Sequence, residues 1–273
     1  MAHAAYAHDK DTDNSKIQTN NQNNTKISKY QHTGVKEEIK SWRNNLQTTD
    51  YQYLCKQEIR KGQMTAAILA SGGLLDTMSS IRSGFKVIWG SDNDTNMQKL
   101  WKNMTCMASL GPAENINYNK IQVPDVLFSG MPCPDWTNLG SEKASKGITG
   151  HLYADQIEWI LTLERRGLKV AVLEQTDNAL RQFKNTVIKI MEKLKSQFYV
   201  TYAVIPVWRF GDVSNRKRLY IIAISKTAGP HAAKFKFPNG KYNENRHAIG
   251  LDIAEPDNQV QEKYIIHQEP RLI

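Results

Sequence analysis

The sequence has few cysteines and no long apolar run. Only three cysteines, Cys55, Cys106 and Cys133, occur among 273 residues, and none forms a Cys-x-x-Cys pair typical of zinc sites. Their odd number and wide spacing exclude a disulfide framework and predict reduced thiols, one of which can be reactive. No stretch of about 18 apolar residues is present to span a bilayer, and the N-terminus lacks the apolar core of a secretory signal. We therefore expect an intracellular protein without a membrane partner, nuclear in a eukaryote and cytoplasmic in a bacterium or virus.

The charge balance is strongly basic. The formal net charge is +9 at pH 7, from 36 lysines and arginines against 27 aspartates and glutamates. Such an excess favours a polyanionic partner, because lysine and arginine gain affinity when they displace counterions from phosphates. Basic proteins that bind no nucleic acid are also common, so composition leaves the partner open.

The order of polar and apolar segments indicates one α/β domain with flanking segments. Residues 1–62 form a polar arm, and its Asp9–Gln31 stretch has almost nothing apolar to bury, so we expect the arm to be partly disordered. Residues 63–228 alternate apolar strands with amphipathic helices, which predicts crossover units and a mainly parallel sheet. After residue 228 the periodicity fades, and residues 229–273 form a separate polar region.

Six strands are predicted in this domain, and a short glycine-containing link joins the last two, which we expect to pair as an antiparallel hairpin. The predicted strands are Thr65–Ala70, Phe85–Gly90, Asp125–Ser129, Lys169–Glu174, Phe198–Val207 and Arg218–Ser225. The clearest helix is predicted over Leu180–Phe198, where apolar residues recur every three or four positions and lysines take the opposite face.

Ligands of an open α/β sheet bind outside the carboxyl ends of its strands, so the residues after each predicted strand are the first candidates. The glycine turn after the first strand lets backbone approach a ligand closely, although an ordinary turn has the same pattern. An acid after the second strand can accept hydrogen bonds from the ribose of a nucleoside cofactor, or simply be a solvated turn residue. The candidates are Ser71, Gly72, Gly73 and Leu74 in the first turn, and Asp92 and Asn93 in the second.

The third strand leads to a cysteine between two prolines, Pro132-Cys133-Pro134. Prolines stiffen the loop, and a thiol presented at a strand end suits a nucleophile, whereas an isolated cysteine is more often a small buried hydrophobe. The fourth strand ends in Glu174, whose apolar surroundings favour partial desolvation and a raised pKa. A structural carboxylate bonded to backbone amides is the competing interpretation.

Two arginines precede the last strand. Arg216 and Arg218 alternate in an extended segment, so their side chains share one side and can clamp a phosphate or a base oxygen. An exposed basic turn has the same pattern, and this segment alone does not distinguish the two.

The order and spacing of these segments resemble the C5-cytosine DNA methyltransferase family, from its first motif to its eighth. The resemblance covers the chain from about Thr65 to Ser225. Pro132-Cys133-Pro134-Asp135-Trp136-Thr137 resembles the family's Pro-Cys-Gln-x-Phe-Ser loop, Gly150-His151-Leu152-Tyr153 its Gly-x-Leu-Phe segment, Leu173-Glu174-Gln175-Thr176 its Glu-Asn-Val motif, and Phe210 to Arg218 its Phe-Gly-Val-Pro-Gln-x-Arg-x-Arg strand entry.

The resemblance implies the Rossmann-like fold of S-adenosylmethionine-dependent methyltransferases, and methyl transfer from S-adenosylmethionine to C5 of cytosine in DNA. It makes Cys133 the nucleophile that adds to C6 and Glu174 the group that holds N3, with Arg216 and Arg218 on the base oxygen and the neighbouring phosphate. The target base must leave the duplex. RNA is an alternative substrate, because a branch of the family methylates transfer RNA. The implied cofactor contacts are Ser71, Gly72, Gly73, Leu74, Asp92, Asn93, Pro132 and Leu152, and no metal is expected.

Several positions depart from the family pattern. Leu74 and Leu75 stand where glycines of the Phe-x-Gly-x-Gly turn are expected, and Ser214 replaces the glutamine of the arginine motif. Gln175-Thr176 replaces Asn-Val. No acid aligns clearly with the third motif, for which Glu114 is one candidate.

The C-terminal region, residues 229–273, resembles the truncated start of the target-recognition region, so that the recognition domain and the last two motifs are expected to be missing. Three interpretations stay open. The chain is a fragment, or a second polypeptide supplies the missing parts, or it is a methyltransferase-like nucleic-acid-binding module without activity.

Overall fold

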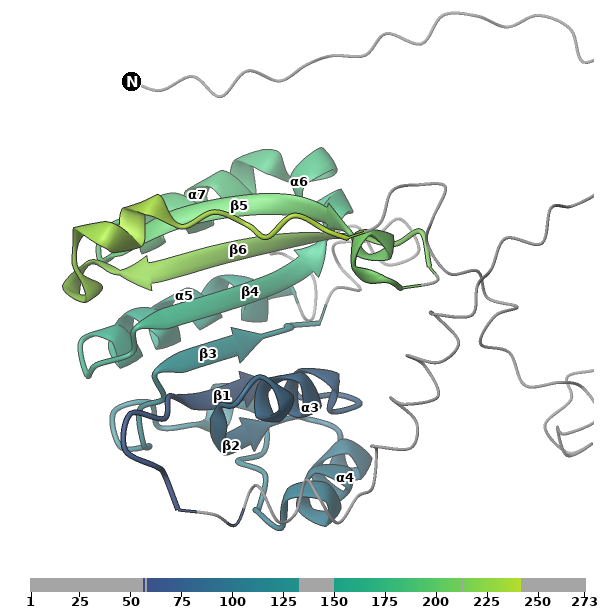
Figure 1. Cartoon of the computed structure of the whole chain (residues 1–273), viewed down its shortest axis with the longest axis vertical. Coiled ribbons are helices and arrows are strands. Elements are labelled where there is room, and N and C mark those ends of the chain that lie inside the picture. The colour runs from purple at the N-terminus through teal and green to yellow at the C-terminus, as the bar shows by residue number, and fades with distance from the viewer. Residues whose placement is uncertain (1–55, 57, 133–149, 213, 242–273) are drawn as a thin grey trace, which may run out of the picture.

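A six-stranded sheet forms the centre of the protein. A computed structural model describes residues 56, 58–132, 150–212 and 214–241 (Figure 1). The sheet has the strand order β2-β1-β3-β4-β6-β5, in which β1 pairs in parallel with β2 and β3, β3 pairs in parallel with β4, and β6 runs antiparallel to both β4 and β5. The strands are β1 (Thr65–Leu69), β2 (Lys86–Ser91), β3 (Val126–Ser129), β4 (Val170–Thr176), β5 (Phe198–Pro206) and β6 (Lys217–Ser225). The predicted fold class, a mainly parallel α/β sheet with a C-terminal antiparallel hairpin, is confirmed.

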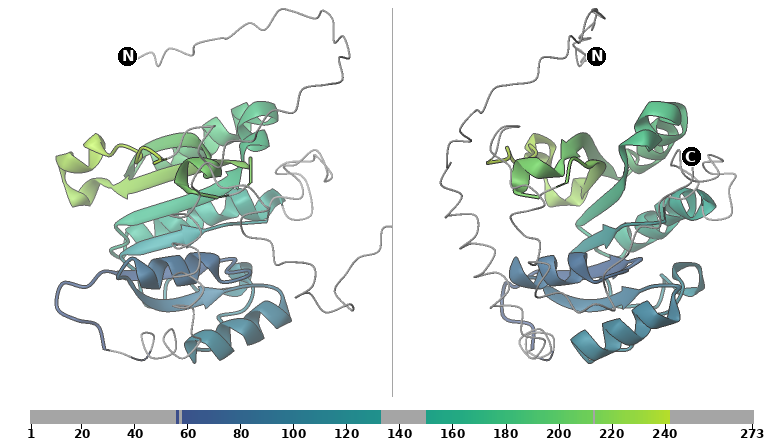
Figure 2. Two further views of the ribbon diagram at one scale, coloured as in Figure 1. Left: turned by 45° about the vertical axis from the view of Figure 1, so that its right-hand side comes forward. Right: turned by 90° about the vertical axis from the view of Figure 1, so that its right-hand side faces the viewer.

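Helices cover both faces of the sheet, and the side chains of β1 alternate between two apolar clusters (Figure 2). On one face, Ala66 and Ile68 of β1 pack with Ile81 and Trp101 of the helices that follow β1 and β2. On the other, Ala67 and Leu69 contact the larger cluster built by the later helices. The helices are α3 (Leu75–Arg82), α4 (Thr95–Thr105), α5 (Gly150–Glu164), α6 (Asp177–Gln182) and α7 (Lys184–Leu194).

Glycine at position 90 lets α4 lie directly on β2. The ring of Trp101, which is fully buried, occupies the space that a Cβ at Gly90 would need. A side chain at position 90 would therefore displace the largest fully buried residue of this layer.

The amino ends of three strands are tied together by one carboxylate. Asp125 Oδ2 accepts hydrogen bonds from the Thr65 backbone N–H at 2.7 Å and from Thr65 Oγ1 at 2.8 Å. Its other oxygen lies 2.6 Å from Lys169 Nζ. Burial by itself raises the pKa of Asp125, but the bonds from Lys169 and Thr65 outweigh burial and hold that pKa below its usual value. This arrangement fixes the starts of β1, β3 and β4 relative to one another.

The single helix predicted over Leu180–Phe198 is wrong at both ends. Helix α6 begins earlier, after Thr176, whose side chain caps it, and the chain leaves helical geometry at Phe183 with φ −116° and ψ 31° before α7 begins. Phe198 is the first residue of β5. Its burial in the core follows from the strand, so its match to the helical period was accidental.

The segment after β6 returns along the hairpin. Short 3-10 helices at Lys226–Ala228 and Pro230–Lys234 lead into an extended stretch that reaches Gly240, which packs closely against Arg209. Residues 1–55, most of the predicted polar arm, lie outside the described residues. No helix in the described ranges is both long and apolar enough to cross a membrane.

Candidate active site

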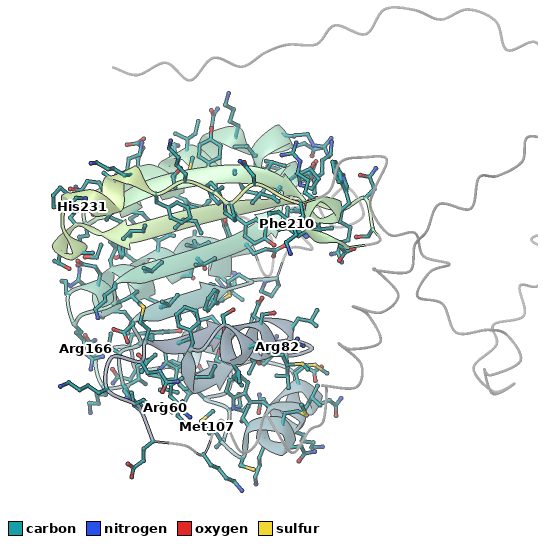
Figure 3. The ribbon with its side chains drawn as sticks, viewed as in Figure 1. Arg60, Arg82, Met107, Arg166, Phe210 and His231 are labelled. Carbon is teal, nitrogen blue, oxygen red and sulfur yellow. The ribbon has the colours of Figure 1, made fainter. Side chains whose placement is uncertain are left out.

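The carboxyl ends of β1, β3 and β4 lie at one edge of the sheet, and the start of the antiparallel strand β6 lies at the same edge. Figure 3 shows Phe210, in the turn before β6, at this edge, whereas Arg166 and His231 lie at the opposite one. The described candidate residues all come from segments at or beside this edge, as the sequence predicts for a ligand site in an open sheet.

The turn after β1 keeps a glycine-like backbone although glycine is absent from one position. Gly72 has φ +45°, and Leu74 has φ +66°, in the left-handed region that glycine adopts most readily. For a leucine this conformation costs roughly 1–2 kcal/mol. Leu74 is only 2% exposed and packs in the cluster with α3, so burial of its side chain offsets the strain. The chain thus makes this turn with a buried leucine in the left-handed conformation.

Asp92, after β2, braces the two neighbouring strand ends. Its Oδ2 accepts a hydrogen bond from the Gly72 N–H at 2.7 Å, its Oδ1 accepts one from the Asp94 N–H at 2.9 Å, and the residue is 7% exposed. Asn93 beside it is exposed. The geometry thus gives Asp92 a clear structural role in shaping the glycine turn. A contact from Asp92 or Asn93 to a ribose stays a prediction.

The edge above the turn has room and unsatisfied polar groups. A Cβ added at Gly73 would meet nothing within 4 Å, and the Ser71 hydroxyl, in a residue only 5% exposed, has no hydrogen-bond partner among the described residues. Pro132, after β3, and Leu152, in the first turn of α5, are both partly buried. These groups suit a nucleoside that carries an amino-acid group. Such a ligand needs a backbone that it can approach closely, a hydroxyl to hydrogen-bond with, and apolar contacts.

Glu174 and Arg218 meet across the β4–β6 pair. Arg218 Nε donates to Glu174 Oε1 at 2.7 Å, and the two side chains are 19% and 34% exposed. Burial raises the pKa of Glu174, Arg218 opposes that rise, and Asp76 adds to it. Within the described part of the chain no hydrogen bond reaches Oε2, so one oxygen is held by the guanidinium while the other is free to carry a proton.

Two side chains of this site were missed by the sequence analysis. Tyr220 lies directly opposite Glu174 in the β4–β6 ladder, and burial, with Glu174 and Asp76, raises its pKa. Asp76 lies in the first turn of α3, and burial raises its pKa as well. Tyr220 lies within the predicted strand Arg218–Ser225, two residues after Arg218, so strand alternation places both side chains on one face. Asp76 carried only the weak signal of an acid at the start of a helix.

The structure describes Arg216, but it does not describe Cys133. Arg216 is exposed, lies just before β6, and its carbonyl accepts a hydrogen bond from the Val207 N–H at 2.9 Å. The structure therefore brings Arg218 to Glu174 and leaves Arg216 at the rim. Cys133 lies outside the described residues, but the chain is followed to Pro132, directly before it, beyond the carboxyl end of β3.

The replacement of Asn-Val by Gln175-Thr176 is accommodated in part, because Gln175 Nε2 is buried without a hydrogen-bond partner among the described residues. Gln175 is fully buried, and its Oε1 accepts a hydrogen bond from the Thr176 N–H at 2.9 Å. Thr176 in turn caps α6 through the Asn178 N–H. Ser214, which replaces the glutamine of the arginine motif, donates its N–H to Asp212 Oδ1 at 2.7 Å. These substitutions therefore shape turns and leave Glu174 and Arg218 in contact.

Glu114, the candidate third-motif acid, is exposed in the short 3-10 helix Ala113–Asn115. In the described part of the chain, no hydrogen bond or ion pair joins Glu114 to the residues above. The described residues contain no group of three or more histidine, cysteine, aspartate or glutamate side chains that is arranged to hold a metal ion.

Comparison with known proteins gives consistent matches. The model of the C-5 cytosine-specific DNA methylase family matches residues 70–270. The type II methyltransferase M.Bsp6I of Bacillus sp. is 25% identical over 181 residues, which cover 63% of this chain and 55% of that protein. M.BsuFI of Bacillus subtilis is 26% identical over 200 residues, covering 71% and 44%. The chain thus spans about half the length of the curated relatives it matches.

Among solved structures, a putative DNA modification methyltransferase encoded within an Escherichia coli prophage aligns with a TM-score of 0.50 at 14% identity. The alignment covers 64% of this chain and 49% of that one. At this identity the likeness concerns the fold alone.

Proposed function

This chain belongs to the C-5 cytosine-specific DNA methylase family, and we propose that it transfers a methyl group from S-adenosylmethionine to C5 of a cytosine in DNA. The observation that carries the proposal is the contact between Glu174 and Arg218 at the carboxyl edge of the sheet. Two residues from separate family motifs, far apart in the sequence, meet there as recognition of one base requires.

Glu174 suits contact with N3 of cytosine. A carboxyl group with a raised pKa retains its proton more readily, and a proton shared with N3 stabilises the charge that develops when the ring is attacked. Arg218 holds Oε1, which orients the carboxyl so that Oε2 faces away from the ion pair. Tyr220, opposite Glu174, restricts the space in which that carboxyl can turn.

Cys133 supplies the nucleophile in this proposal. Its thiolate adds to C6, which makes C5 electron-rich; C5 then takes the methyl group, and loss of the C5 proton expels the thiolate and restores the ring. When bound, S-adenosylmethionine would supply the electrophilic methyl group, with S-adenosylhomocysteine as the other product. Because both ring faces must be reached, the base has to leave the duplex.

The DNA backbone would be bound by the exposed basic turn before β6. Arg209, Arg216 and Lys217 are exposed there, and Phe210, at 49% exposure, is the most exposed aromatic side chain of the turn. Cationic groups at the rim favour phosphates through counterion release, whereas Arg218 is committed to Glu174. The proposed cofactor contacts are the turn of Ser71, Gly72, Gly73 and Leu74, together with Asp92, Asn93, Pro132 and Leu152.

The test is methyl transfer by the full chain to unmethylated genomic DNA, with tritium-labelled S-adenosylmethionine as donor. We expect labelled 5-methylcytosine in the DNA, and a covalent protein–DNA adduct when the DNA contains 5-fluorocytosine. Cys133→Ser should abolish both. Cys106→Ser is the matched control, because Cys106 is exposed at the end of α4 and remote from the other candidates in the sequence, and it should leave both unchanged.

The same assay separates the alternatives. Transfer to transfer RNA but not to DNA would reassign the substrate. Cofactor binding without transfer, even after a candidate partner polypeptide is added, would favour a nucleic-acid-binding module that keeps the fold without activity. An adduct that survives Cys133→Ser would refute the proposed nucleophile.

A further inference from the structure

Asp76 carries a carboxylate that lies over the site without a partner. It is in the first turn of α3, directly after the glycine turn, and its Oδ2 lies 3.9 Å from the position that a Cβ on Gly130 would occupy. Gly130 continues β3 and donates its N–H to the carbonyl of Leu69 at the end of β1. The carboxylate of Asp76 therefore lies above the carboxyl ends of β1 and β3.

This carboxylate also faces Glu174. Ser129, the residue before Gly130, is level with Leu173, the residue before Glu174, and adjacent strands lie about 4.8 Å apart. Consistent with that proximity, the charge of Asp76 raises the pKa of both Glu174 and Tyr220. Asp76 thus belongs electrostatically to the candidate active site, although no motif of the sequence points to it.

The local charge balance is negative. Asp76 and Glu174 are both acids. Arg218 forms an ion pair with Glu174, and no ion pair to Asp76 occurs among the described residues. Among the described residues no hydrogen bond or ion pair engages the Asp76 carboxylate. Asp76 is reached by solvent, yet the protein atoms around it raise its pKa above the usual 3.8, so the ionised form is held at a cost. A cationic group bound here would remove that cost.

We propose that Asp76 accepts a hydrogen bond from the α-ammonium group of the methionine moiety of S-adenosylmethionine. The inference rests on the proposed function and adds a binding residue to it. The amino-acid end of the cofactor is expected over the Ser71–Leu74 turn, and Asp76 is the acid nearest to that turn along the chain. The open space above Gly73 and the unpartnered Ser71 hydroxyl leave room and a polar contact beside it. A charge-assisted bond suits this position, because the ligand is cationic and the residue is an unpaired anion.

A purely structural role makes the opposite prediction about stability. An acid in the first turn of a helix usually interacts favourably with the helix dipole, so its neutralisation lowers the melting temperature. Burial of Asp76 instead disfavours its charged form and raises its pKa. Asp76→Asn, which keeps the shape and removes the charge, should leave the melting temperature of the free protein unchanged or higher.

The experiment measures dissociation constants by calorimetry for wild type, Asp76→Asn and the control Asp155→Asn, which changes an exposed acid on α5. Three probes are used without DNA: S-adenosylmethionine, S-adenosylhomocysteine, and 5′-methylthioadenosine, which lacks the amino-acid group. A bond to a charged group contributes enough for Asp76→Asn to weaken binding of the first two about tenfold or more. Binding of 5′-methylthioadenosine should change less than about twofold, and Asp155→Asn should change none of the three.

Each other outcome overturns the inference in a recognisable way. An equal loss for all three probes means that Asp76 shapes the site as a whole, and no loss means that it does not contact the ligand. A loss confined to S-adenosylmethionine places Asp76 at the sulfonium, which the other two probes lack. If the wild-type protein binds none of the probes, both the proposed function and the inference are refuted. If the wild-type protein binds the probes but Asp76→Asn does not show the predicted loss, only the inference is refuted.

Discussion

The ion pair between Glu174 and Arg218 should make the stability of this protein depend on pH in a way that one substitution reveals. Arg218 Nε and Glu174 Oε1 are 2.7 Å apart, and the side chains are 19% and 34% exposed. Arg218→Met removes the guanidinium and keeps most of the apolar stem. The substitution therefore leaves the Glu174 carboxylate partly buried and without its cation.

The expected magnitude follows from the exposure of the pair. Removal of one partner costs roughly 3–5 kcal/mol for a buried ion pair and at most about 1 kcal/mol for an exposed one. Solvent screens this pair partly, so we expect Arg218→Met to lower the free energy of unfolding by about 2 kcal/mol at pH 8.

The direction with pH follows from the pKa of Glu174. Burial raises it above the usual 4.5, and Arg218 limits that rise. Below pH 4.5 the carboxyl is protonated in the folded and unfolded states, and the penalty for burying its charge is absent. As the pH rises through the raised folded-state pKa, the unfolded chain releases its proton more readily, and stability falls. Without Arg218 the folded-state pKa is higher still, so the loss should be large at pH 8 and small at pH 4.

Urea denaturation followed by circular dichroism, at both pH values, measures the effect for Arg218→Met, Glu174→Gln and the double variant. The Glu174→Gln background should remove most of the pH-dependent loss, because no carboxylate remains to be left unpaired. Lys195→Met is the control, because the Lys195–Glu192 pair, 2.6 Å apart and 50% and 60% exposed, should change stability by less than about 1 kcal/mol at either pH. An equal loss at pH 4 and pH 8, or strict additivity in the double variant, would refute the reasoning.

Two further predictions concern the scaffold. Gly90→Ala should destabilise the protein by about 1–3 kcal/mol because its Cβ collides with Trp101, and urea denaturation should find a smaller cost in a Trp101→Leu background; equal costs would contradict the contact. Asp125→Asn should lower the free energy of unfolding at pH 7 by roughly 1–3 kcal/mol, and the deficit should shrink as the pH falls through the lowered pKa of Asp125, since that contribution exists only above it. A deficit that stays constant from pH 7 to pH 3 would show that the charge on Asp125 is not its source.

The fold was readable from the sequence because buried strands of a parallel sheet are short, apolar and bounded by turns. All six predicted strands are present, and each boundary differs from the prediction by no more than two residues, as for Lys169–Glu174 against Val170–Thr176. The helix error arose at Phe183 and Phe198, where a helical spacing of apolar residues continued through a break and into a strand. Periodicity reports which side chains are buried but not which element buries them.

The site was only partly readable. Cys133, Glu174, Arg216 and Arg218 were predicted to gather around one base. Glu174 and Arg218 are in contact, Arg216 is exposed before β6, and Cys133 lies outside the described residues. The contact of Asp92 with a ribose stays a prediction, and the bonds of its carboxylate to two backbone amides depend on loop geometry that no residue type reveals. Asp76 emerged only from the structure, because its relation to Gly130 and Glu174 crosses three strands that are distant in the chain.

The register of β6 determines whether the contact between Glu174 and Arg218 can form. Arg218 meets Glu174 only because β6 is in a register that sets Thr176 against Arg218 and Glu174 against Tyr220. Inserting or deleting one residue in the turn of residues 207–216 would favour a slip by one position, which moves every side chain of β6 to the opposite face of the sheet. Such a variant would turn Leu219, Ile221 and Ala223 away from the larger apolar cluster, and Glu174 would lose its contact with Arg218. The length of this turn therefore determines the site as much as the identities of Glu174 and Arg218 do.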